Sequence, residues 1–209
     1  MKIGIFLGSF DPIHISHVNL VSILLNSKLV DRVLVCPTVQ NPWKDRTPAP
    51  FEIRCEMLDA ALEPLQETFP GRVLVNDFEK TLKAPVYSYM LLDMIRTAHS
   101  NDELYIICGE DLIPSIKNWK NFDTNIRPYF KYMMFKRSND SNDNHEIGVS
   151  DSFFNEEVEM EGINISLNTN NISSSLIRDL VGNGKCPYPL VNKEVYNIIK
   201  RERLYGFKN

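Results

Sequence analysis

Paired cysteines and long apolar runs are missing from this sequence. The four cysteines stand far apart, with no Cys-X-X-Cys pair and no repeating framework that would staple a small secreted fold. No run of about 18 apolar residues occurs, and the apolar stretch that opens the chain is too short for the core of a signal peptide. These absences predict a soluble protein of a reducing compartment, the cytoplasm with the nucleus left open, and no membrane partner.

An excess of positive charge is also missing. Lys and Arg number 23 against 27 Asp and Glu, which gives a formal net charge of −4. Proteins that bind the phosphate backbone of DNA or RNA usually carry the opposite balance. The charge therefore predicts no nucleic-acid partner and directs any nucleotide chemistry toward small nucleotides.

The length of the chain favours a single domain. With 209 residues, 43% of them hydrophobic, the chain can bury one sizeable core and is short for two. One stretch, SNDSNDNHEIGVS at 138–150, is rich in Asn, Asp and Ser and poor in large apolar residues. We expect one domain over 1–209 with a mobile insertion at 138–150, for which a tolerated surface loop is favoured over a functional lid.

Short apolar runs alternate with helical patterns along the chain, as in repeated βαβ units. Several runs are apolar at nearly every position, which is typical of strands covered by helices on both faces. The predicted fold class is α/β, a Rossmann-like doubly wound, mostly parallel sheet with helices on both faces. Strands are expected at 2–7, 32–38, 72–78, 103–109, 131–137 and 163–168, and helices at 17–25, 51–62, 87–99, 173–181 and 193–203. Ligands of such sheets bind beyond the carboxyl ends of the strands.

The segment after the first expected strand, GSFDPIHISH, combines a glycine with two histidines. Gly8 suits a sharp turn and the close approach of a phosphate, although GxGxxG and GxxxxGK[ST] do not occur. His14 and His17 stand about one helical turn apart and so share a face. No metal site is predicted, because HExxH is missing and no cluster of Cys or carboxylates accompanies the pair. On spacing alone, a pair of solvated or core histidines is an equal alternative to an anion site.

The same segment resembles the [GT]xFDPxHxGH motif of a nucleotidyltransferase superfamily. That superfamily contains the nicotinate and nicotinamide mononucleotide adenylyltransferases, phosphopantetheine adenylyltransferase and the cytidylyltransferases. The resemblance implies that His14 and His17 are catalytic and contact the phosphates of a nucleoside triphosphate, with Gly8, Ser9 and Phe10 beside them at the ATP site.

A second match lies near the other end of the chain, where ISSSLIR at 172–178 resembles the family's ISSTxIR. Hydroxyls at a helix start cap orphan amides, those amides face an anion, and an arginine one turn later supplies a fixed cation. The resemblance adds Ile172, Ser173 and Ser174 to the ATP-binding residues, and it makes Arg178 both ATP-binding and catalytic. Standing alone, this stretch would be an ordinary serine-capped helix with a surface arginine.

Between the two motifs the chain resembles the compact bacterial-type branch of the mononucleotide adenylyltransferases. Arg54 with Met57 matches RxxM, and Tyr87-Ser88 after Glu79 matches a Tyr-Thr pair that follows a carboxylate. The resemblance implies that an aromatic side chain stacks on a pyridine ring and a lysine reaches phosphate. The mononucleotide-binding residues that it implies are Ser9, Phe10, Lys44, Tyr87, Ser88 and Trp119, with Trp119 as the stacking residue.

On the ATP side, the resemblance implies three further residues. Gly109 and Asp111 belong to GED, which matches GxD, and Asp111 suits ribose hydroxyls, a helix cap, or both. Arg137 ends an expected strand near the adenine. Two departures from the pattern stand out, since Ser16 replaces a usual glycine and Trp43 replaces a histidine.

The reaction that the resemblance implies joins ATP to a pyridine mononucleotide. The 5′-phosphate of nicotinate mononucleotide attacks the α-phosphorus of ATP, giving the dinucleotide of NAD biosynthesis and pyrophosphate, with Mg2+ bound mainly through triphosphate oxygens. Alternatives are phosphopantetheine adenylyltransferase and a non-catalytic nucleotide sensor on the same fold. The sequence leaves open the oligomeric state, a homo-oligomer included. It also leaves open the choice between acid and amide mononucleotide, where the family branch alone favours the acid.

Overall fold

The computed structural model describes residues 1–39, 46–82, 85–109, 112–138, 149–150, 162–168 and 172–208. Seven strands in these segments form one sheet in the order β3-β2-β1-β4-β5-β7-β6. The strands are β1 (Lys2–Gly8), β2 (Arg32–Pro37), β3 (Val73–Val75), β4 (Glu103–Gly109), β5 (Lys131–Ser138), β6 (Val149–Ser150) and β7 (Gly162–Asn168). All neighbours pair in parallel except β6, which is antiparallel to β7. The predicted Rossmann-like fold is confirmed.

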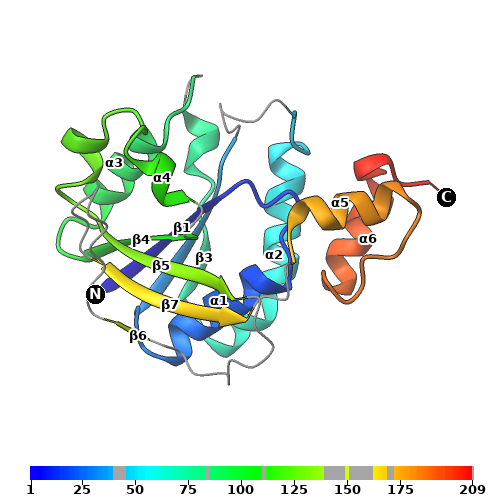
Figure 1. Ribbon diagram of the computed structural model, residues 1–209, viewed down its shortest axis with the longest axis horizontal. Coiled ribbons are helices and arrows are strands. Elements are labelled where there is room, and N and C mark those ends of the chain that lie inside the picture. The colour runs from blue at the N-terminus through cyan, green and yellow to red at the C-terminus, as the bar shows by residue number, and fades with distance from the viewer. Residues whose placement is uncertain are drawn as a thin grey trace.

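Helices cover both faces of the sheet, as the unbroken apolar strands predicted (Figure 1). One hydrophobic cluster packs α1 and α2 on one face and extends to α5 and α6, which lie beyond α2, and a second packs α3 and η3 on the other face (Figure 1). The α-helices are α1 (Ile15–Asn26), α2 (Phe51–Thr68), α3 (Ser88–Ala98), α4 (Ile113–Ile116), α5 (Ser174–Gly182) and α6 (Lys193–Arg201), and the other helical turns are η1 (Phe78–Thr81), η3 (Phe122–Ile126) and η4 (Leu204–Gly206).

Strand β3 is shorter than predicted. A strand was expected over 72–78, but β3 covers only Val73–Val75, and Phe78 begins the 3-10 helix η1. The side-chain oxygen of Asn76 accepts the N–H of Phe78 at 3.1 Å. Such a bond to the backbone two residues further on turns the chain in place of extending it. The prediction was wrong here because Asn76-Asp77 favours a turn that ends the apolar run.

The strand order reverses at β1, which has β2 on one side and β4 on the other. In open α/β sheets this reversal leaves a crevice beyond the carboxyl ends of the two central strands. β1 ends at Gly8 and β4 ends at Gly109, and both glycines were predicted to lie at the ATP site. The topology therefore places two predicted site segments at one edge of the sheet.

Both margins of the predicted insertion at 138–150 belong to the sheet. Ser138 ends β5, where it pairs with Asn168, and Val149 and Ser150 pair with β7. The expectation of a loop is therefore corrected at these positions, where backbone pairing to β7 extends the sheet. Residues 139–148 lie outside the described residues.

The cysteines behave as reduced thiols in this fold. All four lie in the described segments, and none forms a disulfide bond. Burial raises the pKa of Cys36 far above its usual range and that of Cys55 to about 11, so both stay protonated at neutral pH. Within the same segments, no helix has the length and apolarity needed to cross a bilayer.

Helix α6 begins at a cap that also ties it to α2. The side-chain oxygen of Asn192 accepts the N–H of Val195 at 2.8 Å, and its amide nitrogen donates to the carbonyl of Ala60 at 2.8 Å. Asn192→Ala should lower the free energy of unfolding by about 1 kcal/mol in urea titrations, because an orphan donor loses its acceptor. Asn192→Asp is the control that keeps the cap and loses the donor to Ala60. Equal losses in the two variants would contradict the cap as the cause.

Candidate active site

The loop after β1 is strained at Phe10. This residue has a φ of 45°, in the left-handed region that disfavours side chains with a Cβ. Its ring is 3% exposed and packs edge-on against Phe6 and His17, with ring centroids 5.2 Å away in both cases. A Cβ on Gly8 would lie 2.9 to 3.1 Å from three atoms of the Phe10 ring. The ring of Phe10 thus requires a glycine at position 8, a reason that the sequence did not indicate. The φ of Gly8 is not positive, so its backbone conformation does not itself require glycine.

His14 and His17 form the first turn of α1 with their rings stacked. His14 is the N-cap residue and is buried, whereas His17 is half-buried. The ring centroids lie 3.7 Å apart at an interplanar angle of 24°. The N–H of His14 donates a long hydrogen bond of 3.4 Å to Nδ1 of His17. With Nδ1 as acceptor, the proton of the neutral His17 ring lies on Nε2, which makes Nε2 a donor suited to a phosphate oxygen.

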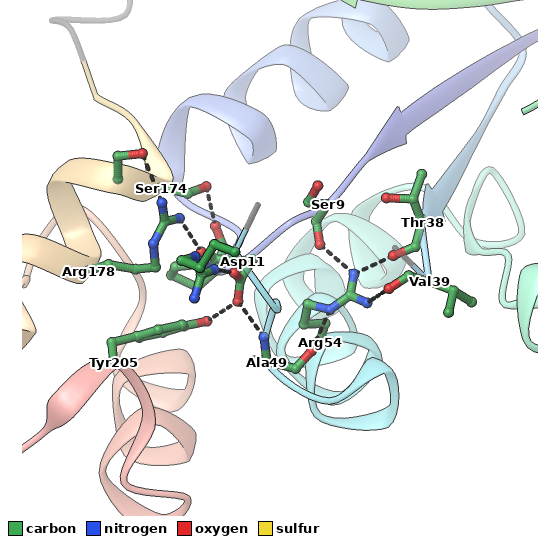
Figure 2. Close-up of polar contacts among 12 residues, drawn as sticks. Ser9, Asp11, Thr38, Val39, Ala49, Arg54, Ser174, Arg178 and Tyr205 are labelled. Atoms are coloured by element: carbon green, nitrogen blue, oxygen red, sulfur yellow. Dashed lines mark hydrogen bonds and ion pairs between the residues drawn. The ribbon is translucent and has the colours of Figure 1, made fainter. Parts of the chain in front are cut away.

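The serine–arginine segment (172–178) packs directly on the histidine loop, which is the stretch 8–17 that follows β1 and enters α1 (Figure 2). The hydroxyl of Ser174 donates to the carbonyl of Pro12 at 2.8 Å, and Nη1 of Arg178 donates to the carbonyl of Asp11 at 2.8 Å. The partners in these bonds are 162 and 167 residues apart in the chain. The structure therefore brings the two predicted motifs together at one place.

Asp11 is the residue on which three other segments converge. Its side chain is buried, and its Oδ1 accepts the N–H of Ala49 at 3.1 Å and the hydroxyl of Tyr205 at 2.8 Å. Its Oδ2 forms an ion pair with Arg46, while its backbone carbonyl takes the bond from Arg178. Figure 2 shows Arg178, Tyr205 and Ala49 directed at Asp11 from three different elements. This buried carboxylate joins the histidine loop to the loop before α2 and to the C-terminal turn η4.

Arg54 fixes the loops after β1 and β2 in place through hydrogen bonds. Its side chain is fully buried, and its guanidinium donates to four carbonyls of these two loops (Figure 2). The acceptors are Ala49 at 2.9 Å, Ser9 at 2.6 Å, Thr38 at 2.7 Å and Val39 at 2.9 Å. Burial lowers the pKa of Arg54, but the guanidinium stays charged because its ordinary pKa is so high. The bond from Arg54 to the carbonyl of Ser9 fixes the backbone of this predicted site residue.

Glu79 also binds the loop after β2. Its carboxylate is buried and accepts the N–H of Val39. Burial raises the pKa of Glu79, an effect opposed by the Val39 bond and by the charge of Arg54. Val39 is thus fixed through both its N–H and its carbonyl. The chain beyond it contains the predicted residue Lys44, which lies outside the described residues.

Three of the predicted mononucleotide-binding residues lie in adjacent segments. Tyr87 is the N-cap of α3 and Ser88 is its first residue. The ammonium of Lys120 lies 4.3 Å from the centroid of the Tyr87 ring, which brings the segment of Trp119 beside the start of α3. Trp119 itself is half-buried against the hydrophobic cluster that contains α3. The remaining described members, Ser9 and Phe10, belong to the histidine loop.

The structure describes some of the other predicted ATP-site residues fully, one by its backbone only, and one not at all. Gly109 ends β4, Ile172 is half-buried against the first hydrophobic cluster, and Ser173 caps α5 with its side chain, as the sequence predicted. The backbone of Arg137 belongs to β5, but its side chain is not described. Asp111 lies outside the described residues.

Sequence reasoning missed several residues that shape this site. Asp11, Arg46 and Tyr205 were assigned no function, and Arg54 was noted only as part of a pattern. Arg54 could have been found, because it stands on the apolar stripe of α2 with Met57 and other buried residues, where an unpaired charge would be costly. No local pattern marks Tyr205 as a partner of a residue 194 positions earlier.

Comparison with known proteins places these features in a family. The sequence model of the cytidylyltransferase-like family matches residues 5–180. A probable nicotinate-nucleotide adenylyltransferase of Fusobacterium nucleatum is 31% identical over 208 residues, covering 97% of this chain and 98% of the relative. A protein of the same description from Clostridium tetani is 30% identical over 205 residues, with 98% of each chain covered.

Solved structures show the same fold. A Plasmodium falciparum nicotinic acid mononucleotide adenylyltransferase complexed with NaAD superposes with a TM-score of 0.77 at 19% identity, covering 99% of this chain and 98% of that one. The same enzyme complexed with APC gives a TM-score of 0.76. The likeness extends over the whole architecture, including the C-terminal part that follows the family match.

Proposed function

This chain belongs to the cytidylyltransferase-like family and, within it, to the nicotinate-nucleotide adenylyltransferases, and from that membership we propose its reaction and its site. The enzyme transfers the adenylyl group of ATP to the 5′-phosphate of nicotinate mononucleotide. The products are the dinucleotide and pyrophosphate, a step of NAD biosynthesis. Nicotinamide mononucleotide is a second acceptor to be tested.

The observation that carries this proposal is the docking of the serine–arginine segment on the histidine loop. Bonds from Ser174 to Pro12 and from Arg178 to Asp11 join two segments that both begin helices. Helix N-termini offer unpaired N–H groups and a positive dipole end, which favour anions. Two such ends, with two imidazoles on the first segment and a guanidinium on the second, suit a polyphosphate better than a neutral ligand.

The chemistry requires no nucleophilic side chain. The attacking phosphate is already ionised at neutral pH, so in-line positioning and stabilisation of developing charge are enough. We assign His14, His17 and Arg178 as the catalytic residues, which donate hydrogen bonds to the α-phosphoryl group and the leaving pyrophosphate. The ATP site further includes Gly8, Ser9, Phe10, Gly109, Asp111, Arg137, Ile172, Ser173 and Ser174.

Mg2+ enters this scheme as the complex with ATP. In the segments that the structure describes, no group of three or more His, Cys, Asp or Glu side chains is arranged to hold a metal ion. We propose that the ion binds mainly through triphosphate oxygens, since Mg2+ in such sites takes much of its coordination from substrate phosphates and water. When bound, the ion supplies positive charge to the triphosphate.

Substitution of Trp119 tests the pyridine side of the proposed site. The other residues that we propose for this side are Ser9, Phe10, Lys44, Tyr87 and Ser88. Trp119→Ala should raise the KM for the mononucleotide about tenfold, because base stacking on an aromatic ring contributes roughly 1–3 kcal/mol. The KM for ATP should change little. Trp119→Phe keeps an aromatic face and should retain most of the affinity. A rise in both KM values to the same extent would contradict a role in pyridine stacking.

The function itself is tested with a panel of phosphate acceptors. The protein is incubated with ATP, Mg2+ and either nicotinate mononucleotide, nicotinamide mononucleotide or phosphopantetheine, and released pyrophosphate is measured. The highest kcat/KM is expected for nicotinate mononucleotide. Release with phosphopantetheine alone would favour that adenylyltransferase, and tight ATP binding without release from any acceptor would favour a nucleotide sensor.

The organisation of the protein is proposed on sequence grounds. We propose a single domain over 1–209, a cytoplasmic location and no nucleic-acid partner. The length of the chain supports the single domain, the net charge of −4 supports the lack of a nucleic-acid partner, and the four widely spaced cysteines support a reducing compartment. The small-molecule partners are ATP and the pyridine mononucleotide.

A further inference from the structure

Two guanidinium groups meet at one carboxylate in the candidate active site. Arg46 forms an ion pair with Oδ2 of Asp11, and Arg178 donates to the carbonyl of the same residue. One negative charge therefore faces two positive charges at this residue. The excess positive charge lies at the junction of the histidine loop and the serine–arginine segment, where a polyphosphate is proposed to bind.

Arg46 and Asp11 differ sharply in their exposure. The side chain of Arg46 is 47% exposed, whereas that of Asp11 is 4% exposed. A guanidinium carries five N–H donors in a planar fork, and the ion pair with Asp11 engages it through Nη2. Arg46 can therefore bind a second anion from the solvent side while it stays paired with Asp11.

We propose that Arg46 is a phosphate-binding residue of this enzyme, which acts with Arg178 on the triphosphate of ATP and on the leaving pyrophosphate. The proposal rests on the proposed function and deepens it, because no residue of the loop that leads into α2 was assigned to the triphosphate. The chemical class of the ligand is an inorganic or nucleotide-linked polyphosphate, whose oxygens match the planar fork of arginine.

Asp11 gives this arginine a fixed starting position. The carboxylate is held by the N–H of Ala49 and the hydroxyl of Tyr205, so it anchors Arg46 at a defined point. A side chain that is oriented before binding loses less conformational entropy when the ligand arrives. The C-terminal turn η4, which lies beyond the family match at 5–180, thereby takes part in shaping the phosphate site.

Calorimetric titration with inorganic pyrophosphate in the presence of Mg2+ tests the proposal on the full-length protein. Arg46→Met should weaken pyrophosphate binding about tenfold, the change expected when one charge-assisted hydrogen bond is lost. Arg46→Lys keeps the charge without the fork and should fall between Arg46→Met and wild type. In steady-state assays, Arg46→Met should raise the KM for ATP by a similar factor and leave the KM for the mononucleotide nearly unchanged.

Two control variants separate direct binding from indirect effects. Tyr205→Phe removes the hydroxyl that holds Asp11 but keeps Arg46, so its effect on pyrophosphate binding should be clearly smaller than that of Arg46→Met. Arg201→Met removes an exposed arginine of α6 that pairs with Glu56, and it should bind pyrophosphate as wild type does. An equal effect of Tyr205→Phe and Arg46→Met would overturn direct binding and assign the loss to Asp11.

The outcomes also distinguish this proposal from the proposed function. If wild type makes the dinucleotide, two results would overturn the role of Arg46 while the function stands. Either Arg46→Met binds pyrophosphate as well as wild type does, or wild type does not bind pyrophosphate. If wild type makes no dinucleotide while its pyrophosphate binding depends on Arg46, the reaction fails and the phosphate site stands. A rise in the KM for the mononucleotide alone would overturn the assignment to the triphosphate.

Discussion

His17→Ala should lose about 10²–10³-fold in kcat, equivalent to roughly 2–4 kcal/mol in the activation barrier. The proposed role of His17 is to donate from Nε2 to phosphate oxygens as charge develops on the α-phosphoryl group and on pyrophosphate. Its ring is held for this task by stacking on His14 and by edge contacts with Phe6 and Phe10. A donor that is already oriented needs no reorganisation during the reaction, which is why its loss affects kcat strongly.

The fold should survive this substitution, because His17 is only half-buried. Circular dichroism and thermal unfolding check that point, and pyrophosphate release under saturating ATP and mononucleotide measures kcat. His99→Ala is the matched control, since His99 is half-buried beside Asp102, 3.2 Å from its carboxylate, at the end of α3 opposite to Tyr87 and Ser88. Near-normal turnover of a folded His17→Ala protein would remove this residue from the mechanism.

The Arg54→Met variant should be the least stable of the substitutions considered, with a loss of about 3–5 kcal/mol in the free energy of unfolding. Four carbonyls of the loops after β1 and β2 lose their donor at once. Because the side chain is fully buried, water cannot easily replace the guanidinium. For a chain of this length, such a loss corresponds to roughly a 10 °C decrease in Tm.

Thermal and urea unfolding measure this effect, with Arg201→Met as the control. Arg201 makes a two-pronged ion pair with Glu56, but both side chains are exposed, and exposed ion pairs usually contribute little. The control should therefore melt close to wild type. Arg54→Lys should recover only part of the stability, because an ammonium cannot reach the four acceptors in the geometry of the planar fork. An Arg54→Met protein as stable as wild type would contradict the proposed clamp.

Local chemistry made much of the fold predictable. The apolar runs of β1, β2 and β4 could be assigned because strands buried on both faces need apolar side chains at nearly every position. The prediction failed at β3, where Asn76 forms a turn, and at Val149 and Ser150, which pair with β7 despite their polar surroundings in sequence. Turn bonds and edge pairing are decided by individual contacts that an average over a window does not contain.

In the candidate site too, some features could be predicted from the sequence and others depended on contacts that only the structure shows. The two histidines, Ser173 and Arg178 could be selected from sequence because their segments resemble two family motifs, and both segments lie at helix starts, where caps and anion contacts involve residues a few positions apart. The meeting of these motifs at Asp11 could not be read from spacing.

The sequence by itself determined the alternation of strands and helices, the family and the residue types that suit phosphate. Only the tertiary structure decided that Tyr205 holds Asp11, that Arg46 pairs with it, and that Arg54 serves two loops. The physical reason is that periodicity and capping act over a few neighbouring residues, whereas a buried polar group takes whichever partner the packed chain brings to it, at any separation along the sequence.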